Sequence, residues 1–464
     1  MGESKEYIYF DATISLCVEC HKKIEAKIIF ENDNVYMIKT CKEHGFQKVL
    51  IADDVEYYKR IRNYNRKSDY PKVPHTEVRY GCPYDCGLCA DHEQHSCLAL
   101  IEVTDRCNLT CPTCYASSSP THGRHRTLEE IRFMVEAVVA SEGEPDIIQI
   151  SGGEPTIHPQ FFEIVDLVRE YPVKHLMINT NGIRIADDFT FAEKLASYQP
   201  DFELYLQFDS LKSENLMQLR GRDLLEIRMK TLEHLNKLNL STTLVITLQK
   251  GFNDSEIGEL IEFALKQKCV RGITFQPVQV AGRLTQFDAS KDRLTNTEVR
   301  SAILAQTDIF TPEDLIPVPC NPDALIMGYA LKQKDKVVPL TNLIDPELLL
   351  NSGTNTIVFE QNEELQKHVI EMFSASKSTN KAEQVFNQLL CCLPKVLAPK
   401  ISYDNLFRII IMNFMDAYDF DIRAIKKSCV HIVHTDGRII PFETMNMFYR
   451  DSFREKLETF QVKG

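Results

Sequence analysis

The sequence predicts an α/β protein built around a partial (β/α)6 barrel, with an N-terminal metal-binding ribbon and a helix-rich C-terminal domain. Three observations support this prediction. Strand-like and helix-like segments alternate from Leu98 onward, pairs of metal-ligand residues flank a hairpin pattern near the N-terminus, and helical patterns dominate after residue 311. We expect the ribbon at residues 1–75, a cysteine-rich cluster loop at 76–97, the barrel at 98–310 and the C-terminal domain at 311–464.

The predicted barrel consists of apolar, strand-like runs separated by helical patterns. Near-continuous apolar strands that alternate with helices are typical of a parallel sheet. Thr127 with Glu130, and Thr295 with Glu298, have the spacing of helix capping boxes. We expect strands at 98–104, 147–151, 174–179, 203–208, 242–248 and 272–276, and helices at 128–142, 159–171, 190–198, 224–238 and 255–267.

Polar residues follow several of these strands. Active sites in such sheets gather at the C-terminal ends of the strands, so these residues are candidates for ligand contacts. Hydrogen bonds within loops and caps are the alternative for each of them. The candidates are Asn179 and Asn181 after the third strand, Gln207 and Asp209 after the fourth, Thr247 after the fifth and Gln276 after the sixth.

Beyond residue 311 we expect helices, notably at 382–390 and 405–418. The second helical pattern places several large apolar residues on one wide face. That face either packs in the core or forms a wall for an apolar substrate. The residues concerned are Leu406, Ile409, Ile410, Phe414 and Met415.

The composition is that of a soluble globular protein. The 464 residues include 53 Lys+Arg and 66 Asp+Glu, which gives a net charge of −13. This acidity argues against nucleic-acid binding through bulk charge. The chain has no run of apolar residues long enough to span a bilayer, and the N-terminus has no apolar signal segment. We therefore expect a cytoplasmic protein.

The 15 cysteines indicate metal or redox chemistry, because a disulfide framework is not expected in the cytoplasm. Cys17 and Cys20 precede a hairpin pattern, and Cys41 and His44 follow it. Two such knuckles around a hairpin predict a tetrahedral Cys3His site for zinc or a mononuclear, rubredoxin-like iron. Four protein ligands leave no open position, so this site should be structural.

Two further groups share one spacing, and they differ in the number of thiols. Four thiols close a [4Fe–4S] cluster, whereas three leave one iron open for a ligand. We therefore expect a closed, electron-handling auxiliary cluster in the first group and an open, catalytic cluster in the second. The first group is Cys82, Cys86, Cys89 and Cys97; the second is Cys107, Cys111 and Cys114. Cys269 stands alone and is expected to be inert core.

The segment after the second predicted strand carries a glycine motif. Gly152 and Gly153 allow a close backbone approach, and the carboxylate of Glu154 could hold an ammonium group. Arg283, just beyond the sixth strand, could meet a carboxylate or phosphate, or lie on the surface.

CNLTCPTC at 107–114, followed by GGEP at 152–155, resembles the radical S-adenosylmethionine (SAM) superfamily. The resemblance implies that SAM chelates the open iron through its amine and carboxylate, and that the GGEP stretch also holds the amine. One-electron reduction, by an external donor of the flavodoxin or ferredoxin type, then releases a 5′-deoxyadenosyl radical that attacks an unactivated C–H bond. By strand order, Asn181, Gln207 and Asp209 would contact SAM. Thr113 stands where the superfamily often has an aromatic residue; Tyr115 either compensates or packs beneath the loop.

The whole chain resembles one branch of this superfamily, the tetraether lipid synthases and 7,8-dihydro-6-hydroxymethylpterin dimethyltransferase-like proteins. This resemblance implies three iron–sulfur clusters, one mononuclear metal and C–C bond formation on a lipid chain. The matching stretches are Cys17–Cys20 with Cys41–Gly45, GCPYDCGLCADHEQHSC at 81–97, CNLTCPTCYASSS at 107–119, GGEPTIHP at 152–159, PCNPDA at 319–324, CCLP at 391–394 and SCVHIVHTDGRIIPF at 428–442.

One position departs from the branch, because Glu443 stands where a cysteine is usual. Cys320 and Cys429 remain for a third [4Fe–4S] cluster, with Cys391 or Cys392 as further candidates. Three interpretations are open. Glu443 ligates iron through oxygen, a neighbouring cysteine substitutes, or this cluster is absent.

Three functions follow as hypotheses. The leading one is C–C coupling on a lipid chain, which would require peripheral membrane contact to reach the lipid. The second is methylation of a pterin precursor, and the third is a non-enzymatic electron carrier. An apolar tunnel would favour the lipid, whereas a small pocket with amide and carboxylate groups would favour the pterin. No nucleic-acid partner is expected.

Overall fold

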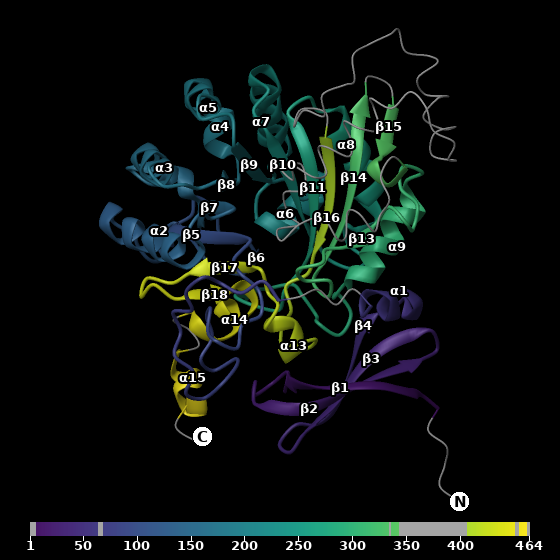
Figure 1. Cartoon of the computed structure of the whole chain (residues 1–464). Helices are drawn as coiled ribbons and strands as arrows, with labels where there is room; N and C mark the ends of the chain where they lie inside the picture. Colours follow the sequence, from purple (N-terminus) through teal and green to yellow (C-terminus); the bar gives the residue numbers. More distant parts are fainter. Residues whose placement is uncertain (1–5, 64–67, 334–335, 343–405, 451–453, 462–464) are drawn as a thin grey trace, which may run out of the picture.

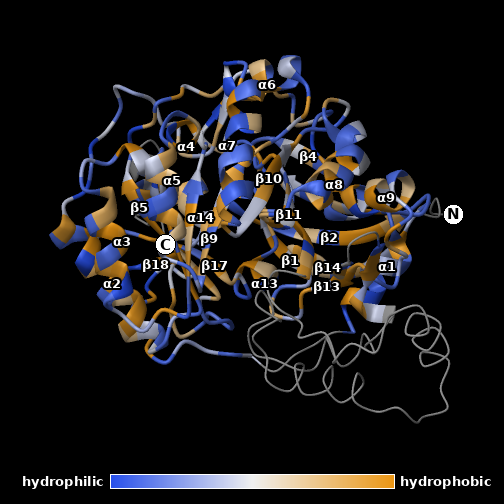
Figure 2. Cartoon of the chain, turned by 90° about the horizontal axis from the view of Figure 1, so that it is seen from above, coloured by the Kyte–Doolittle hydropathy of each residue, from blue (hydrophilic) through white to orange (hydrophobic). Residues whose placement is uncertain are grey.

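The computed structural model describes residues 6–63, 68–333, 336–342, 406–450 and 454–461. A ribbon of antiparallel strands lies below a large, curved sheet whose outer face is covered by helices (Figure 1). The strands of the sheet are mostly hydrophobic, and the outer helices turn hydrophilic residues outward (Figure 2). No helix among the described residues is long and apolar enough to cross a membrane.

The N-terminal ribbon is a four-stranded antiparallel sheet in chain order. The predicted hairpin is its central pair of strands. Each of the two outer turns carries one of the predicted ligand pairs, so the turns bring Cys17, Cys20, Cys41 and His44 to one end of the sheet. The elements are β1 (Ile8–Leu16), β2 (Lys23–Glu31), β3 (Asn34–Cys41) and β4 (Gly45–Ala52), followed by α1 (Val55–Ile61).

The ribbon is anchored to the C-terminal part of the chain. The buried ammonium of Lys39 donates to the carbonyls of Ala417 (2.7 Å) and Tyr418 (2.8 Å). The hydroxyl of Thr13 donates to the carboxylate of Asp421 at 2.7 Å. Buried hydrogen bonds to charged groups are among the stronger ones, so the ribbon is docked firmly.

The six predicted barrel strands are confirmed, and they pair in parallel. Both predicted capping boxes are also present. The strands are β5 (Leu98–Thr104), β7 (Ile147–Gly152), β8 (His175–Thr180), β9 (Phe202–Gln207), β10 (Thr242–Leu248) and β11 (Val270–Pro277). The predicted helices correspond to α2 (Leu128–Glu142), α3 (Phe161–Arg169), α5 (Phe189–Ala196), α7 (Leu225–Leu238) and α8 (Ile257–Lys266); α4 (Ile183–Asp187) and α6 (Ser213–Arg220) are additional.

The helix predicted at 405–418 is wrong, because Leu406–Met412 forms strand β16. This run is apolar and rich in isoleucine, and almost all of it is buried. Periodicity cannot separate a short buried strand from a buried helix, and β-branched residues favour the strand. β16 pairs in parallel with β11 and antiparallel with β14 (Leu325–Gln333). The expected helix at 382–390, together with Cys391 and Cys392, lies outside the described residues.

The described residues after 311 therefore extend the barrel sheet rather than forming a separate helical unit. β16 lengthens it beside β11, and β17 (Val430–Val433) lengthens it at the opposite edge, in parallel with β5. The remaining strands are β6 (Thr113–Cys114), β12 (Arg283–Leu284), β13 (Ile316–Pro317), β15 (Lys336–Pro339) and β18 (Ile439–Pro441). The remaining helices are α9 (Asn296–Gln306), α13 (Ile422–Ile425), α14 (Phe442–Thr444), a π-helix at Met445–Tyr449 and α15 (Arg454–Gln461).

A buried ion pair joins β16 to the barrel. One guanidinium nitrogen of Arg408 donates to both carboxylate oxygens of Glu203, each at 2.8 Å. Burial opposes the charge of Glu203, but the Arg408 guanidinium outweighs it and lowers the pKa of Glu203 to about 2. The pair thus ties a late segment of the chain to the middle of the barrel.

Candidate active site and cysteine centres

The loop that follows β5 carries Cys107, Cys111 and Cys114, and these three residues line a cavity inside the barrel. Cys107 and Cys111 are buried, and Cys114 is partly exposed. The cavity opens at the C-terminal ends of the strands, where active sites of such sheets lie. Its lining includes the predicted residues Gly152, Gly153, Glu154, Asn179, Asn181, Gln207, Thr247 and Gln276.

Arg283 holds the cysteine loop in place. Its guanidinium donates to the carbonyls of Cys111 (2.5 Å), Ser117 (3.3 Å) and Ser118 (2.7 Å). The side chain is partly exposed and bonds to backbone carbonyls, and contact with a carboxylate or phosphate stays a prediction. It acts as a positioning residue for the three thiols.

The two glycines bring the end of β7 against the cysteine loop. A Cβ atom on Gly152 would lie 2.2 Å from the carbonyl of Thr104, and one on Gly153 would lie 2.2 Å from the carbonyl of Arg106. Gly152 also has φ +124°, which side chains disfavour. The amide of Gly153 donates to the carbonyl of Thr104 at 2.8 Å. Only glycine permits this close approach.

The carboxylate of Glu154 is buried and organises the ends of two strands. Its Oε1 accepts from the hydroxyls of Thr156 (2.6 Å) and Thr180 (2.8 Å), and its Oε2 accepts from the amide of Asn181 (2.7 Å). Burial raises the pKa of Glu154 despite these bonds. Oε2 accepts fewer bonds than Oε1, so it is the oxygen that could receive an ammonium donor.

The other predicted polar residues form one network with Arg220, which the sequence analysis missed. Arg220 donates to both carboxylate oxygens of Asp209, at 2.7 and 2.5 Å, and to Gln207 Oε1 at 3.1 Å. Gln207 donates to Asn179 Oδ1 at 2.9 Å. Asp209 thus lies behind Arg220 rather than in the lining. Asn181 bridges to the cysteine loop by donating to Asn108 Oδ1 at 2.7 Å.

A second missed arginine, Arg228 on α7, lines the cavity although its side chain is fully buried. It donates to the carbonyl of Asn181, and its Nε and Nη2 atoms have no hydrogen-bond partner among the described residues. Burial lowers its pKa to about 10. An arginine within the apolar stripe of an amphipathic helix is the sequence signal that could have revealed it.

The residues of this cavity suit an iron–sulfur core held by thiolates, together with a ligand that carries a carboxylate and an ammonium group. Burial, and then the nearby Glu154 carboxylate, raises the pKa of the Cys107 thiol to about 12. Thiols that are hard to ionise in an empty pocket become thiolates when iron binds. The guanidinium of Arg228, whose Nη2 lies 3.8 Å from Asp209 Oδ2, would match a further carboxylate through its Nε. The donor set therefore fits a cysteine-bound iron–sulfur cluster and SAM.

The wall opposite the cysteine loop combines amide side chains with aromatic rings. The Gln276 amide nitrogen donates to the hydroxyl of Tyr205 at 3.1 Å. Tyr115 packs against Phe442 with ring centroids 4.9 Å apart, which supports the packing role considered for it. The wall residues are Gln149, Tyr205, Gln276, Gln279, Met412, Phe414, Val430 and Phe442.

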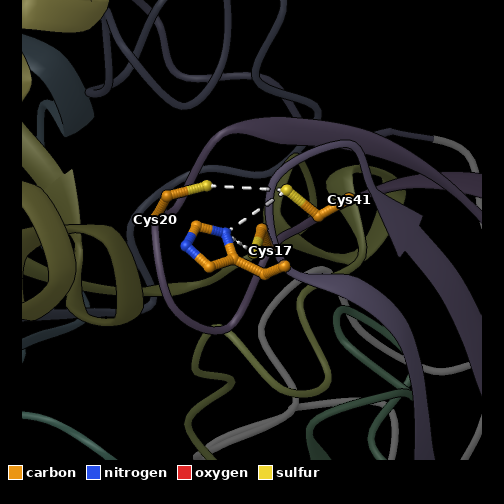
Figure 3. Close-up of side chains that lie close together, drawn as sticks. Cys17, Cys20 and Cys41 are labelled. Carbon is orange, nitrogen blue, oxygen red and sulfur yellow. Dashed lines mark hydrogen bonds between the residues drawn. The ribbon is translucent and has the colours of Figure 1, made fainter.

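The ribbon end forms a compact group of metal-ligand residues. The ligand atoms of Cys17, Cys20, Cys41 and His44 lie within 4.8 Å of one another. The thiols of Cys17 and Cys41 are each 3.5 Å from His44 Nδ1, and the thiols of Cys20 and Cys41 are 3.9 Å apart (Figure 3). This arrangement matches the predicted Cys3His site, with Nδ1 as the imidazole donor.

Comparisons with known proteins agree with both sites. Residues 101–264 match the radical SAM superfamily, and residues 9–53 match the HMPTM N-terminal zinc ribbon domain. The chain is 33% identical to 7,8-dihydro-6-hydroxymethylpterin dimethyltransferase of Methanocaldococcus jannaschii, over 96% of this chain and 95% of that protein. The chain belongs to this radical SAM family.

More distant relatives match a smaller part of the radical SAM enzyme. A probable GTP 3′,8-cyclase of Pyrococcus abyssi is 32% identical over 37% of this chain and 53% of its own length. Among solved structures, Streptococcus suis SuiB bound to S-adenosylmethionine aligns over 46% of this chain and 47% of its own, with 17% identity and a TM-score of 0.37.

The auxiliary cysteine loop of the radical SAM enzyme lies against the C-terminal segment. The amide of Cys86 donates to the hydroxyl of Tyr449 at 2.7 Å, and the hydroxyl of Thr444 donates to the Cys86 thiol at 2.9 Å. Burial, followed by the neighbouring Cys82 thiol, raises the pKa of Cys86. Cys89 is also buried, and burial raises its thiol pKa. Among the described residues, no group of three metal-ligand atoms within 4.8 Å of one another includes these thiols. A cluster shared by Cys82, Cys86 and Cys89 stays a prediction.

Cys97 does not complete that group as predicted. Its ligand atom lies within 4.8 Å of those of Cys320 and Cys429, and all three residues are buried. The physical reason is strand pairing, since Cys97 directly precedes β5 and Cys429 directly precedes β17. The short spacing to Cys89 is therefore a poor guide to its partners. Cys269 is buried in the core, as predicted.

Proposed function

We propose that this radical SAM enzyme replaces a hydrogen by a methyl group on a small, reduced pterin-like ring. One SAM would yield the radical that removes the hydrogen and leave as 5′-deoxyadenosine and methionine. A second SAM would donate the methyl group and leave as S-adenosylhomocysteine, and the external reductant would supply the two electrons that this balance needs. The observation that carries the proposal is the cavity wall, which contains both glutamine amides and aromatic rings. Amides pair with the donor and acceptor edge of a heteroaromatic ring, and aromatic side chains pack on its faces. The family relative with a pterin in its name supports the same choice.

When bound, the cluster and SAM would supply a carbon radical able to abstract hydrogen from a C–H bond. The side chains of Cys107, Cys111 and Cys114 would hold the cluster, and Arg283 keeps their loop rigid. Arg228 would bind the carboxylate of SAM, and Glu154 Oε2 would face its ammonium. Asn181 links Glu154 to the cysteine loop, because its backbone amide donates to Glu154 and its side chain donates to Asn108.

Gln276 is the residue we propose for substrate recognition. Its nitrogen is held by Tyr205, which orients the amide oxygen as an acceptor for a ring N–H. A polar substrate group that loses its buried hydrogen-bond partner in the enzyme lowers kcat/KM strongly. Gln276→Leu should therefore lower kcat/KM by about 10- to 100-fold for a pterin.

Lipid coupling is a second candidate, and a specific observation supports it. Met412, Phe414 and Val430 form an apolar part of the same wall, two of them in or next to β16. An acyl chain would contact these residues but would offer no hydrogen-bond donor to the amide oxygen of Gln276, which is costly. The amide content of the wall therefore favours the pterin.

An anaerobic assay separates the two substrates. The reconstituted enzyme is mixed with dithionite and SAM, and with either 7,8-dihydro-6-hydroxymethylpterin or a total lipid extract. Mass spectrometry then quantifies 5′-deoxyadenosine and methylated or coupled products. We expect the pterin to raise the 5′-deoxyadenosine yield and to gain methyl groups.

The control is the Cys107→Ala, Cys111→Ala, Cys114→Ala variant, which should be silent with either substrate. A lipid-dependent yield with no effect of the pterin would replace the pterin proposal by lipid coupling. Equal silence of the wild-type enzyme and the variant at full cluster loading would remove the catalytic role of these cysteines.

A further inference from the structure

Gln149 is a buried glutamine in the middle of strand β7. Its neighbours Ile148 and Ile150 are fully buried on the outer face of the strand, since successive side chains of a strand alternate between faces. Gln149 therefore points to the inside of the barrel, where it lines the cavity with only 3% of its surface exposed. Strands of a buried parallel sheet are normally apolar, so a glutamine at this position calls for a physical reason.

The other amide side chains of the cavity lining are held by the protein itself. The nitrogen of Gln279 donates to the carbonyl of Met415 at 2.9 Å, and its oxygen accepts from Asn446 at 3.0 Å. The nitrogen of Gln276 donates to the hydroxyl of Tyr205. Side-chain hydrogen bonds to protein groups are also made by Asn179, Asn181 and Gln207.

Gln149 differs from all of them, because its amide makes no hydrogen bond with any residue that the structure describes. A buried amide without a partner costs free energy, and native proteins contain few such groups. A ligand that supplied both a donor and an acceptor would recover this cost. The amide of Gln149 therefore marks the place in the cavity where a polar part of a ligand binds.

Gln149 also lies deeper in the barrel than the glycine motif. Its strand register pairs it with Leu100 of β5 on one side and with Met177 of β8 on the other. Gly152, at the end of β7 that meets the cysteine loop, follows three residues later, which corresponds to about 10 Å along the strand. Gln149 thus faces the inner part of the cavity, away from the groups proposed to hold SAM.

We propose that Gln149 recognises a lactam edge of the substrate, that is, a ring carbonyl beside a ring N–H. Its nitrogen would donate to the carbonyl and its oxygen would accept from the N–H, so that one amide makes two parallel hydrogen bonds. This assignment rests on the proposed pterin-like substrate, whose pyrimidinone ring carries such an edge. Gln276 is separated from Gln149 by three strands of the sheet, so it would contact a different N–H of the ring.

The test measures binding to the SAM-loaded holoenzyme by anaerobic isothermal titration calorimetry without reductant. The two probes are 7,8-dihydro-6-hydroxymethylpterin and 9-methylguanine, which carries the same lactam edge but no reduced ring. Gln149→Met replaces the amide by an apolar side chain of similar length. We expect it to weaken the binding of both probes by about 10- to 100-fold, the range for a buried polar group that loses its partner.

Thermal unfolding of the substrate-free holoenzyme separates a ligand-binding role from a structural one. Gln149→Met should keep or raise the unfolding midpoint, because a thioether needs no hydrogen-bond partner. Gln249→Met is the matched control, since Gln249 is a buried glutamine outside the cavity lining whose amide donates to Asp292 at 3.3 Å. It should lower the midpoint and bind both probes as the wild-type protein does.

Equal binding by the wild-type protein and Gln149→Met would overturn the role of Gln149, even if the pterin is methylated. A fall of the midpoint in Gln149→Met as large as that in Gln249→Met would also overturn it, because the amide would then have a partner within the protein. If 9-methylguanine binds through Gln149 and the pterin does not bind, the lactam site stands and the proposed substrate fails. If the wild-type protein binds neither probe, the assignment of Gln149 to a lactam edge fails.

Discussion

Cys107, Cys111 and Cys114 come from eight consecutive residues of one loop, whereas Cys97, Cys320 and Cys429 come from three segments far apart in the chain. The first set is brought together by a single turn that Arg283 clamps. The second set is brought together only when β5 and β17 pair and the segment before β14 folds against them. Substitution of the cysteines in the single loop should therefore leave the fold intact. Substitution of the cysteines that come from three distant segments should destabilise it.

The largest effect expected from this comparison is the contrast between Cys111→Ala and Cys429→Ala. Cys111→Ala should abolish formation of 5′-deoxyadenosine and leave the thermal unfolding midpoint nearly unchanged. Cys429→Ala should lower the midpoint by several degrees, because its centre links three segments. Anaerobic activity assays and thermal unfolding followed by circular dichroism measure both.

Cys269→Ala controls for the loss of a buried sulfur alone. Its midpoint should fall by much less than that of Cys429→Ala. Equal shifts in the two variants would show that the assembled centre adds nothing to stability beyond packing.

The second prediction concerns the ion pair that joins β16 to the barrel. Glu203→Gln removes the carboxylate that pairs with the buried Arg408 guanidinium, so the free energy of unfolding should fall by about 3 kcal/mol at pH 7. Anaerobic urea denaturation measures this change, with the exposed Glu193→Gln as the control. A loss as small as that of the control would mean that β16 is held by packing alone.

The same pair predicts a pH dependence. The pKa of Glu203 is about 2 in the folded protein, below the value of about 4.3 in an unfolded chain. The contribution of the carboxylate is therefore fully present above pH 5 and is lost as the pH falls through 4 towards 2. The stability difference between the wild-type protein and Glu203→Gln should shrink over that range and stay constant from pH 6 to 8.

The third prediction tests whether the local loop depends on its clamp. Arg283→Ala removes three hydrogen bonds to carbonyls of the cysteine loop. We expect about a tenfold lower rate of SAM cleavage, since charge-assisted hydrogen bonds contribute about 1.5–3 kcal/mol each and part of this is recovered by water. The exposed Arg222→Ala should keep the wild-type rate. An unchanged rate in Arg283→Ala would show that the loop is rigid by itself.

The smallest effect is expected at the ribbon site, where each of the two ligand pairs lies within four consecutive residues. The Gln47 amide donates to the Cys17 thiol at 3.3 Å. Gln47→Leu should weaken metal retention by about tenfold, the low end for outer partners of metal ligands. Competition with a chelator measures this, and the exposed Gln286→Leu should match the wild-type protein. Loss of the whole ribbon fold in Gln47→Leu would contradict a merely supporting role.

The barrel and its cysteine loop could be predicted because their signals are local. The apolar run at 98–104 and the motif at 152–155 each report on a few consecutive residues, and the structure agrees with both. Strand β16 was predicted as a helix because a short run of apolar residues has the same sequence pattern in a buried strand and in a buried helix. Arg220 was missed because nothing near it in sequence marks it as a cavity residue, and Arg228 was missed although it lies in the buried stripe of α7.

The sequence by itself determined the order of strands and helices in the barrel, the ligand pairs of the ribbon and the three-cysteine loop. These depend on hydrophobic period and on spacings of two to four residues, which act within one turn or strand. Only the tertiary structure decided that Cys97 joins Cys320 and Cys429, and that the carboxylate of Glu443 accepts a hydrogen bond from Ser428. Those contacts depend on which strands pair at the two edges of the sheet, and pairing between distant segments follows from the fit of buried surfaces rather than from residue spacing.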